Sequence, residues 1–381
     1  MTAKGRIAFV ANTSWSIYKF RLYLIERLLH EGFAVYVLAP RDAYTGKFEQ
    51  LPGLSYIELH HFHAKSLSPI HDYRLYRELF RHYRTLKPAI IFHYTVKANL
   101  YGTRAAARAR IPSISVITGL GYTFAGEGWL QRVVRMGYRR TLRKSAEVWF
   151  LNEDDRQIFT SQHLVPSGKA FLLPGEGVDT TRFYPAPYAP KTPSQTVTFL
   201  LIGRLIRHKG IDEFVQAAGS LKAQGLNVQC QILGFFDEKN PVAIPRSRVD
   251  EWVAEKIITY FGHTDDVRPY IQQADCIVLP SYREGLPLSL LEGASMCKAL
   301  IATDTAGCRA LIEEGVNGYL CREKDGADLA AKMAAYYNLA PAEKKQMGLD
   351  GRSRVLQRYT QETVAAIYLE KIKTLRQSGH D

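Results

Sequence analysis

The chain has 381 residues, more than a single hydrophobic core of about 250–300 residues normally supports, so we expect two domains. With 46 % hydrophobic and 23 % charged residues it is not a disordered protein, and its net charge of +13 indicates an anionic partner: nucleic acid, an anionic membrane or a phosphorylated substrate. Its five cysteines lack the spacing of a disulfide framework or a zinc ribbon and favour a reducing compartment, and we expect neither a signal peptide nor a membrane span.

Short apolar runs alternate with helical patterns through the first half of the chain. This alternation is typical of a doubly wound parallel sheet. Strands are expected at residues 6–12, 33–40, 56–61, 89–95, 113–118, 148–152 and 171–174. Helices are expected at residues 19–31, 72–87, 97–110, 129–144 and 153–163.

A proline-rich stretch at 185–195 interrupts the pattern and predicts a linker, because proline removes backbone donors and stiffens the chain. The alternation then restarts. Strands are expected at residues 197–203, 228–234, 257–262, 276–280, 300–303 and 318–321, and helices at residues 211–224, 266–274, 287–297, 309–315 and 327–338, with two more toward the C-terminus.

This organisation predicts an α/β protein of two Rossmann-like, doubly wound domains. The first spans residues 1–184 and the second 196–358, and a C-terminal helix at 359–381 packs back on the first. A ligand is expected in a cleft between the domains, at the carboxyl ends of the strands.

The most informative segment is YREGLPLSLLEGASMC at residues 282–297, which follows the apolar strand CIVLP. Pro287 suits the first turn of a helix, so the amides of Leu288 and Ser289 are free to bind phosphate oxygens. Glu284, in the loop, and Glu292, on the helix, can accept hydrogen bonds from hydroxyl groups. Without this strand–loop–helix setting, two such glutamates would be solvated acids.

A second motif, GRLIRHKG, follows the apolar strand TFLLIG and contains Gly203, Arg204, Lys209 and Gly210. Two cations beside a helix start can neutralise a diphosphate without a metal ion, and arginine can do so in a bidentate manner. By itself the motif fits a basic surface loop equally well.

Together the G-R-x4-K-G and E-x7-E motifs resemble those of the retaining glycosyltransferases of family 4, which have the GT-B fold. ADCIVLPS at 274–281, the E-x-G-x-N-G pattern at 313–318 and GEGVD at 175–179 fit the same family. Their order and spacing make the resemblance specific.

The resemblance implies a UDP-sugar donor bound by the second domain and no metal cofactor. Arg204, Lys209 and Glu284 are the implied catalytic residues: the two cations hold the diphosphate and Glu284 contacts sugar hydroxyls. Glu292 binds the ribose. The implied nucleotide-sugar site consists of Gly203, Arg204, Lys209, Leu288, Ser289 and Glu292.

The first domain departs from the common family pattern. Thr118 stands where many members have a catalytic histidine, and Gly119 follows it. The TGLGY run at 118–122 and the HYTVKANLYG run at 93–102 resemble the subgroup that extends lipid-diphosphate-linked sugars in bacterial glycan pathways, such as N-acetylgalactosaminyltransferases acting on undecaprenyl-diphosphate-linked acceptors.

Acceptor or sugar contacts are therefore expected from strand ends of the first domain. They are Asn12, His93, Lys97, Thr118 and Gly119. A strand-end histidine with satisfied hydrogen bonds and a surface lysine remain the alternatives for His93 and Lys97. Arg21 either reaches an acceptor phosphate or is a surface arginine.

The positive charge is concentrated in the first domain. Residues 1–184 hold 26 of the 50 basic residues but only 14 of the 37 acidic ones, which gives this part a charge of +12. The helix at 129–144 carries an arginine stripe expected to dock on an anionic membrane: Arg132, Arg135, Arg139 and Arg143. A second basic stripe lies on the helix at 72–87 beside aromatic residues. The alternative is that both stripes are merely solvated faces.

We therefore interpret the chain as a retaining, metal-independent glycosyltransferase at the cytoplasmic face of the cell membrane. It would transfer a sugar, an N-acetylhexosamine or a hexose, from a UDP-sugar to a polyprenyl-diphosphate-linked saccharide. A GT-B non-hydrolysing sugar-nucleotide epimerase is the alternative enzyme. A nucleic-acid-binding protein is disfavoured, because no groove-reading or aromatic RNA-binding motif is recognisable.

Overall fold

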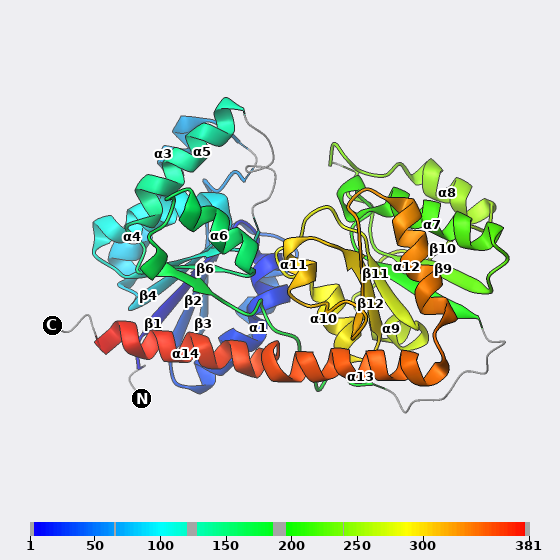
Figure 1. The fold of residues 1–381 in the computed structure, drawn as a ribbon. Coiled ribbons are helices and arrows are strands. Elements are labelled where there is room, and N and C mark those ends of the chain that lie inside the picture. The colour runs from blue at the N-terminus through cyan, green and yellow to red at the C-terminus, as the bar shows by residue number, and fades with distance from the viewer. Residues whose placement is uncertain (1–3, 65, 120–127, 186–195, 239, 378–381) are drawn as a thin grey trace. The chain divides into compact units, whose positions relative to one another are not determined.

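The computed structural model describes residues 4–64, 66–119, 128–185, 196–238 and 240–377 (Figure 1). The chain forms two compact units, Met1–Glu176 with Gln361–Asp381, and Gly177–Thr360. The division thus falls between Glu176 and Gly177, ahead of the expected domain end at residue 184. The expected linker lies almost wholly outside the described residues.

The first unit is built on a seven-stranded parallel sheet with the order β3-β2-β1-β4-β5-β6-β7. Its strands are β1 (Arg6–Val10), β2 (Ala34–Ala39), β3 (Leu54–Glu58), β4 (Ile90–Tyr94), β5 (Ser113–Ile117), β6 (Glu147–Phe150) and β7 (Ala170–Leu172). The parallel doubly wound sheet predicted from the alternating pattern is confirmed.

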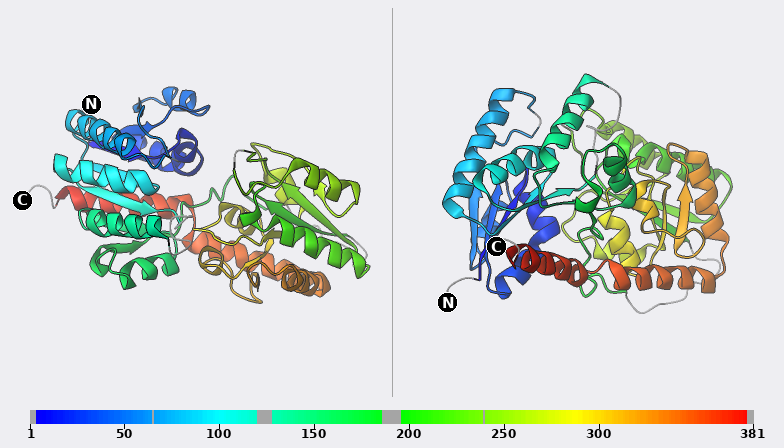
Figure 2. Two further views of the ribbon diagram at one scale, coloured as in Figure 1. Left: turned by 90° about the horizontal axis from the view of Figure 1, so that it is seen from above. Right: turned by 60° about the vertical axis from the view of Figure 1, so that its left-hand side comes forward.

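Helices cover both faces of this sheet (Figures 1 and 2). They are α1 (Ser14–His30), α2 (Thr45–Glu49), α3 (Pro69–Leu86), α4 (Thr103–Ala109), α5 (Trp129–Leu142), α6 (Glu153–Ser161) and α14 (Gln361–Gln377), with a π-helical turn η1 (Ala98–Gly102) and a 3-10 turn η3 (Ser167–Lys169). The short α2 was not predicted, because a segment of five residues carries little periodicity. The helix expected at 97–110 begins as the π-helical turn η1 and continues as α4.

Alternate residues of β4 show how the two helical layers are held. Ile91 packs in the core with residues of α3 and α4, whereas Phe92 lies against Tyr368 of α14 with ring centroids 4.9 Å apart. The Tyr94 and Tyr368 hydroxyls are 2.9 Å apart, and both side chains are buried. Lys371 of α14 also donates to Glu147 at 2.8 Å. The C-terminal helix is therefore part of the core of the first unit.

The second unit contains a six-stranded parallel sheet with the order β10-β9-β8-β11-β12-β13. Its strands are β8 (Val197–Ile202), β9 (Val228–Leu233), β10 (Thr259–Tyr260), β11 (Cys276–Leu279), β12 (Ala299–Thr303) and β13 (Gly318–Cys321). Its helices are α7 (Ile211–Ala223), α8 (Arg246–Ala254), α9 (Arg268–Gln273), α10 (Leu288–Ser295), α11 (Ala306–Arg309), α12 (Gly326–Asn338), α13 (Pro341–Arg358) and the 3-10 turn η4 (Arg207–Lys209).

Both faces of this second sheet are buried. In β8, Phe199 and Leu201 belong to one apolar cluster and Leu200 to another. This alternation follows from the two-residue period of a strand, and it explains why the strand sequence is apolar throughout. The loops that follow these strands are thereby fixed at one edge of a rigid sheet.

Candidate functional site

The predicted donor-site residues gather at the carboxyl ends of β8 and β11 in the second unit. Gly203 and Arg204 follow β8 directly, and Lys209 ends the turn η4. Glu284 lies in the loop between β11 and α10. Because β8 and β11 are neighbours in the sheet, their carboxyl ends bring the two motifs together.

Backbone and side-chain hydrogen bonds join the two loops. The amide of Tyr282 and the hydroxyl of Ser281 both donate to the carbonyl oxygen of His208, at 2.9 and 3.0 Å. Gly210 has a φ of +70°, and a Cβ there would lie 2.0 Å from the carbonyl oxygen of Pro280. Only glycine allows this close approach in a left-handed conformation, which explains the last residue of the G-R-x4-K-G motif.

The clamped loops place the ammonium group of Lys209 in an ion pair with the carboxylate of Glu284. The two side chains are largely buried, with exposures of 21 % and 12 %. A pair buried to this extent is screened less by water and salt than a surface pair. The structure thus brings together two of the three predicted catalytic residues.

Arg204 lies at the same edge but is more exposed, at 47 %, and pairs with Asp237 at 3.2 Å. Asp237 follows β9 and was not among the predicted site residues. Only its position, a few residues after a strand end, could have suggested Asp237 from the sequence.

The helix α10 begins at Leu288, and Pro287 is its N-cap residue rather than part of its first turn. The amides of Leu288 and Ser289 precede the first intrahelical hydrogen bonds, so they are the donors that a helix start offers to an anion. Glu292 lies further along α10 and is 5 % exposed. Its contact with a ribose remains a prediction.

Aromatic side chains lie at the neighbouring strand ends of the second unit. Phe235, after β9, is 39 % exposed, and its ring meets that of His263, after β10, with centroids 5.6 Å apart. A Cβ on Gly234 would lie 1.7 Å from the carbonyl oxygen of Gly203, so the β9 loop packs directly against the donor motif. Sequence reasoning missed these two aromatic residues, because neither belongs to a motif.

His93 does not fit the predicted acceptor contact. Its side chain is fully buried, with Nε2 2.9 Å from the hydroxyl of Tyr83 and Nδ1 3.3 Å from that of Thr103. Burial lowers the pKa of His93 to about 3, so the ring is neutral. The alternative interpretation, a satisfied histidine at a strand end, is the one that the geometry supports.

Lys97 is engaged within the first unit. It donates to Asp72 at 2.7 Å and to the carbonyl oxygen of Ser66, and Tyr101 donates to the other oxygen of Asp72 at 2.6 Å. With an exposure of 12 %, Lys97 connects α3 to the segment after β4. The predicted acceptor contact by Lys97 is therefore not favoured by this arrangement.

Three other predicted acceptor residues lie at carboxyl strand ends of the first unit. Asn12 follows β1, and Thr118 and Gly119 follow β5; all three are partly exposed. Gly119 has a φ of +131°, a conformation that favours glycine. The rest of the TGLGY run lies outside the described residues, so these contacts stay predictions.

Arg21 is neither at the surface nor available to a phosphate. Its guanidinium group pairs with Glu176 and lies 3.7 Å from the ring centroid of Tyr94. Burial raises the pKa of Glu176, and the charge of Arg21 opposes that shift. This buried pair connects α1 to Glu176, the last residue of the Met1–Glu176 part of the first unit.

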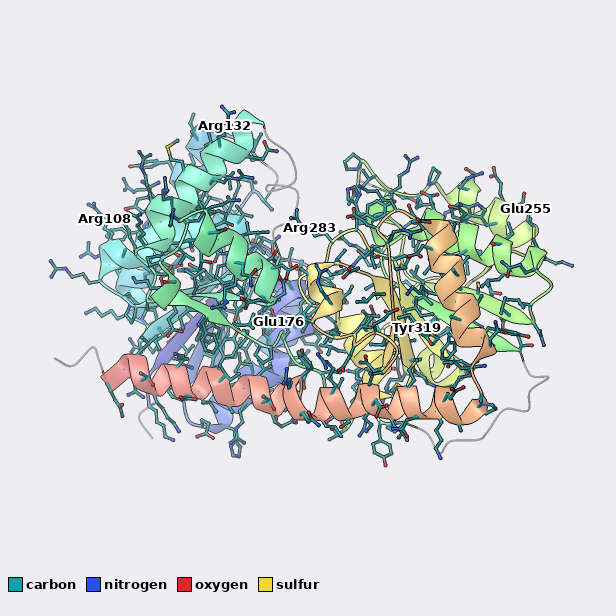
Figure 3. All side chains as sticks on the ribbon, in the orientation of Figure 1. Arg108, Arg132, Glu176, Glu255, Arg283 and Tyr319 are labelled. Carbon is teal, nitrogen blue, oxygen red and sulfur yellow. The ribbon has the colours of Figure 1, made fainter. Side chains whose placement is uncertain are left out.

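The basic stripe on α5 is present, but one of its four arginines is not fully exposed. Arg132, Arg139 and Arg143 are exposed, whereas Arg135 is half-buried. Val133 of the same helix is 50 % exposed although it is apolar. Figure 3 shows Arg132 at the end of α5 that lies farthest from the sheet of the first unit.

Within the described residues, no group of three or more histidine, cysteine, aspartate or glutamate side chains is placed to hold a metal ion. In the same part of the chain, no helix is both long and apolar enough to cross a membrane.

Comparisons with known proteins define the class. Residues 196–338 match the family model described as glycosyl transferases group 1, and residues 19–176 match that described as glycosyl transferase 4-like domain. The chain therefore belongs to glycosyltransferase family 4, a family of retaining enzymes, and has the GT-B fold. The resemblance inferred from the motifs is confirmed.

One curated relative is the N,N'-diacetylbacillosaminyl-diphospho-undecaprenol alpha-1,3-N-acetylgalactosaminyltransferase of Campylobacter jejuni, 28 % identical over 96 % of this chain and 97 % of its own length. Among solved structures, sucrose-phosphate synthase from Thermosynechococcus elongatus gives a TM-score of 0.82 at 19 % identity, covering 98 % of this chain and all of the other. HepE from Anabaena, solved with UDP, gives 0.77 at 16 % identity, with coverages of 97 % and 100 %.

Proposed function

We propose that this glycosyltransferase transfers a sugar, with retention of configuration, from a UDP-sugar to a polyprenyl-diphosphate-linked saccharide. The observation that carries the proposal is the Lys209–Glu284 pair, held at the carboxyl ends of β8 and β11 just ahead of α10. HepE, a protein of the same fold, binds UDP, and the Campylobacter relative acts on an undecaprenol-linked diphosphate acceptor.

Donor binding in this proposal exchanges the partners of the ion pair. The diphosphate takes Lys209 and Arg204 from their carboxylates, and the amides of Leu288 and Ser289 bind its oxygens. Glu284 is then free to accept hydrogen bonds from hydroxyl groups of the sugar. The Lys209–Glu284 pair would thus bind both the diphosphate and the sugar of the donor.

The same groups stabilise the transition state. The bond between the anomeric carbon and the diphosphate oxygen breaks while the acceptor hydroxyl attacks on the same face, and its proton passes to a diphosphate oxygen. Negative charge therefore grows on the diphosphate, beside Arg204, Lys209 and the start of α10. Because two cations and a helix start supply this stabilisation, we expect transfer to continue in the presence of a metal chelator.

The acceptor and the site of action follow from the distribution of charge. The first unit carries nearly all of the excess positive charge, and the α5 stripe of Arg132, Arg135, Arg139 and Arg143 would attract an anionic membrane surface. A membrane-borne, phosphorylated acceptor fits such a surface. We place the enzyme at the cytoplasmic face of the cell membrane, where UDP-sugars are available.

Two substitutions test the exchange of partners. We expect Lys209→Ala to weaken UDP binding and to lower turnover by about a hundredfold or more. Glu284→Gln should lower turnover comparably without weakening UDP binding, because it removes the carboxylate that competes with the diphosphate for Lys209. Calorimetry with UDP and transfer of radiolabelled sugar to a lipid-linked acceptor measure the two effects.

The matched control is Lys222→Ala, which removes an exposed lysine of α7 that contacts only backbone oxygens in the described structure. It should leave both UDP binding and turnover unchanged. If Lys209→Ala turns over at a rate close to that of the wild type, Lys209 does not bind the donor diphosphate and the proposed exchange of partners is wrong.

A further inference from the structure

The second basic stripe expected from the sequence lies on the surface formed by α3 and α4 of the first unit. It borders an open groove of about 670 Å³. Tyr73, Tyr76 and Phe80 form the aromatic part of its lining. Successive rings lie 6.3 and 6.4 Å apart along α3.

Thr85 and four arginines form the rest of the lining; the arginines are Arg77, Arg81, Arg84 and Arg108. The guanidinium groups of Arg84, from α3, and Arg108, from α4, lie 5.8 and 5.5 Å from the ring centroid of Phe80. One ring therefore holds a cation from each helix through cation–π contacts. Figure 3 shows Arg108 on the outer side of the first unit.

These four guanidinium groups form no ion pair with any carboxylate of the described residues. Other surface arginines of the first unit do: Arg27 pairs with Glu31 at 2.9 Å and Arg156 with Glu153 at 2.7 Å. The groove is thus an uncompensated cluster of positive charge.

The acidic residues of α3 are used elsewhere. Glu78 accepts hydrogen bonds from the amides of His60 and His61, at 2.9 and 3.0 Å, and is buried. Asp72 accepts from Lys97 and Tyr101. Neither carboxylate can turn to the groove without giving up these bonds, so the positive charge there is built into the fold.

The surroundings of the groove indicate a lipid surface. At the N-terminal end of α3, Leu67, Ile70 and Tyr73 are 68 %, 63 % and 57 % exposed. Exposed aliphatic residues beside arginines are typical of interfacial segments, whose apolar side chains enter the acyl region while the cations meet phosphates. Single-stranded nucleic acid would use the rings and arginines but leave Leu67 and Ile70 unpaired.

We propose that the α3–α4 groove binds the phosphate of an anionic lipid headgroup, as a discrete site distinct from the α5 stripe. The proposal rests on the proposed function, because it places the first unit on the membrane that carries the acceptor. Guanidinium groups from two helices can bind one phosphate in a bidentate manner from two sides.

The test compares two double variants of the full-length protein that remove the same charge from the same helices. Arg84→Gln with Arg108→Gln removes the pair on Phe80. Arg74→Gln with Arg104→Gln removes two exposed arginines of α3 and α4 that do not line the groove. Binding is measured by co-sedimentation with phosphatidylcholine vesicles that contain phosphatidylglycerol, and with vesicles of phosphatidylcholine alone.

We expect the groove variant to lose affinity for the anionic vesicles by about tenfold or more, and the control by less than about threefold. Equal losses would show diffuse attraction and overturn a discrete site. So would equal binding of the wild type to both kinds of vesicle. The four substituted arginines, Arg74, Arg84, Arg104 and Arg108, are all exposed, so both double variants should keep the wild-type melting temperature. The single variant Arg81→Gln is a second test and should lose affinity for the anionic vesicles by a smaller factor.

Further arms separate the headgroup from other anions and from the enzymatic activity. If inorganic phosphate or a single-stranded oligonucleotide binds the groove as tightly as the vesicles do, the lipid proposal is wrong. Transfer to a water-soluble, short-chain acceptor should be unchanged in the groove variant. If the wild type transfers no sugar while the vesicle difference persists, the proposed function fails and the groove site stands.

Discussion

Gly210, the last residue of the G-R-x4-K-G motif, is expected to affect both the free energy of unfolding and turnover. A methyl group there would meet the carbonyl oxygen of Pro280 at 2.0 Å, in a backbone conformation with φ +70°. We expect Gly210→Ala to lower the free energy of unfolding by at least about 2 kcal/mol, and to lower turnover by moving Lys209.

The matched control is Gly219→Ala, because Gly219 lies inside α7 and a Cβ added to it would meet no atom within 4 Å other than its own helix backbone and chain neighbours. Helix propensity predicts that this change stabilises the protein by roughly 0.5–1 kcal/mol. Denaturant unfolding measures both variants. A Gly210→Ala variant as stable as the wild type would contradict the close contact between the two loops.

His93 makes the stability of the first unit depend on pH. Its pKa is about 3 in the folded state against an ordinary value of 6.5, so the folded state binds the proton less tightly than the unfolded state. The stabilisation is complete above pH 6.5 and is lost as the pH falls from 6.5 toward 3, by about 1.4 kcal/mol for each pH unit.

Denaturant unfolding at a series of pH values measures this slope. We expect His93→Gln to be less stable than the wild type at neutral pH and to lose less stability on acidification. If the slopes of the two proteins are the same between pH 6 and about 4.5, the ring is not buried in its neutral form.

At the scale of elements, α14 is expected to stabilise the first unit, although it is the last helix in the chain. Tyr368 is fully buried between β4 and β6, with its ring 4.9 Å from that of Phe92 and 4.7 Å from that of Trp149. Tyr368→Ala should cost about 3–5 kcal/mol of unfolding free energy. Lys373→Ala, at an exposed position of α14, should cost less than about 0.5 kcal/mol.

Thermal unfolding of the two α14 variants, followed by circular dichroism, gives the comparison. Similar melting temperatures for Tyr368→Ala and the wild type would mean that α14 is not part of the core of the first unit.

Most elements of the fold follow from the sequence, because parallel strands buried on both faces leave long apolar runs, and the helices between them have amphipathic periods. The failures concern short elements. The helix α8 was not predicted, and β10 contains two residues where six were expected. An edge strand of that length leaves almost no pattern of its own.

The clustering of the two donor-site motifs was predictable, because their residues have fixed spacing after two neighbouring strands. Asp237 and Phe235 were missed, because their place beside the site depends on how the β9 loop packs against Gly203. For His93 the sequence left an acceptor contact and a satisfied strand-end histidine open, and the geometry favours the second. A strand end suggested exposure, whereas Tyr83 and Thr103 enclose the ring.

At the scale of the whole molecule, the charge of +13 is unevenly distributed, and its distribution matches the functions proposed for the two halves, acceptor and membrane binding in the first and donor binding in the second. The first half carries +12 of it, together with the α5 stripe and the α3–α4 groove, while the second half is nearly balanced and holds the nucleotide-sugar motifs. The sequence charge alone allowed nucleic acid as a partner. The placement of cations beside exposed apolar residues favours a membrane-borne acceptor instead.

The central claim is that this enzyme moves a sugar from UDP to a lipid-linked acceptor with retention. The most direct measurement incubates the full-length protein with a panel of UDP-sugars and an undecaprenyl-diphosphate-linked acceptor, in the presence of a metal chelator, and determines the anomeric configuration of the product by NMR. We predict release of UDP and a product with the configuration of the donor sugar. A product of inverted configuration, or an epimerised UDP-sugar with no transfer, would contradict the account.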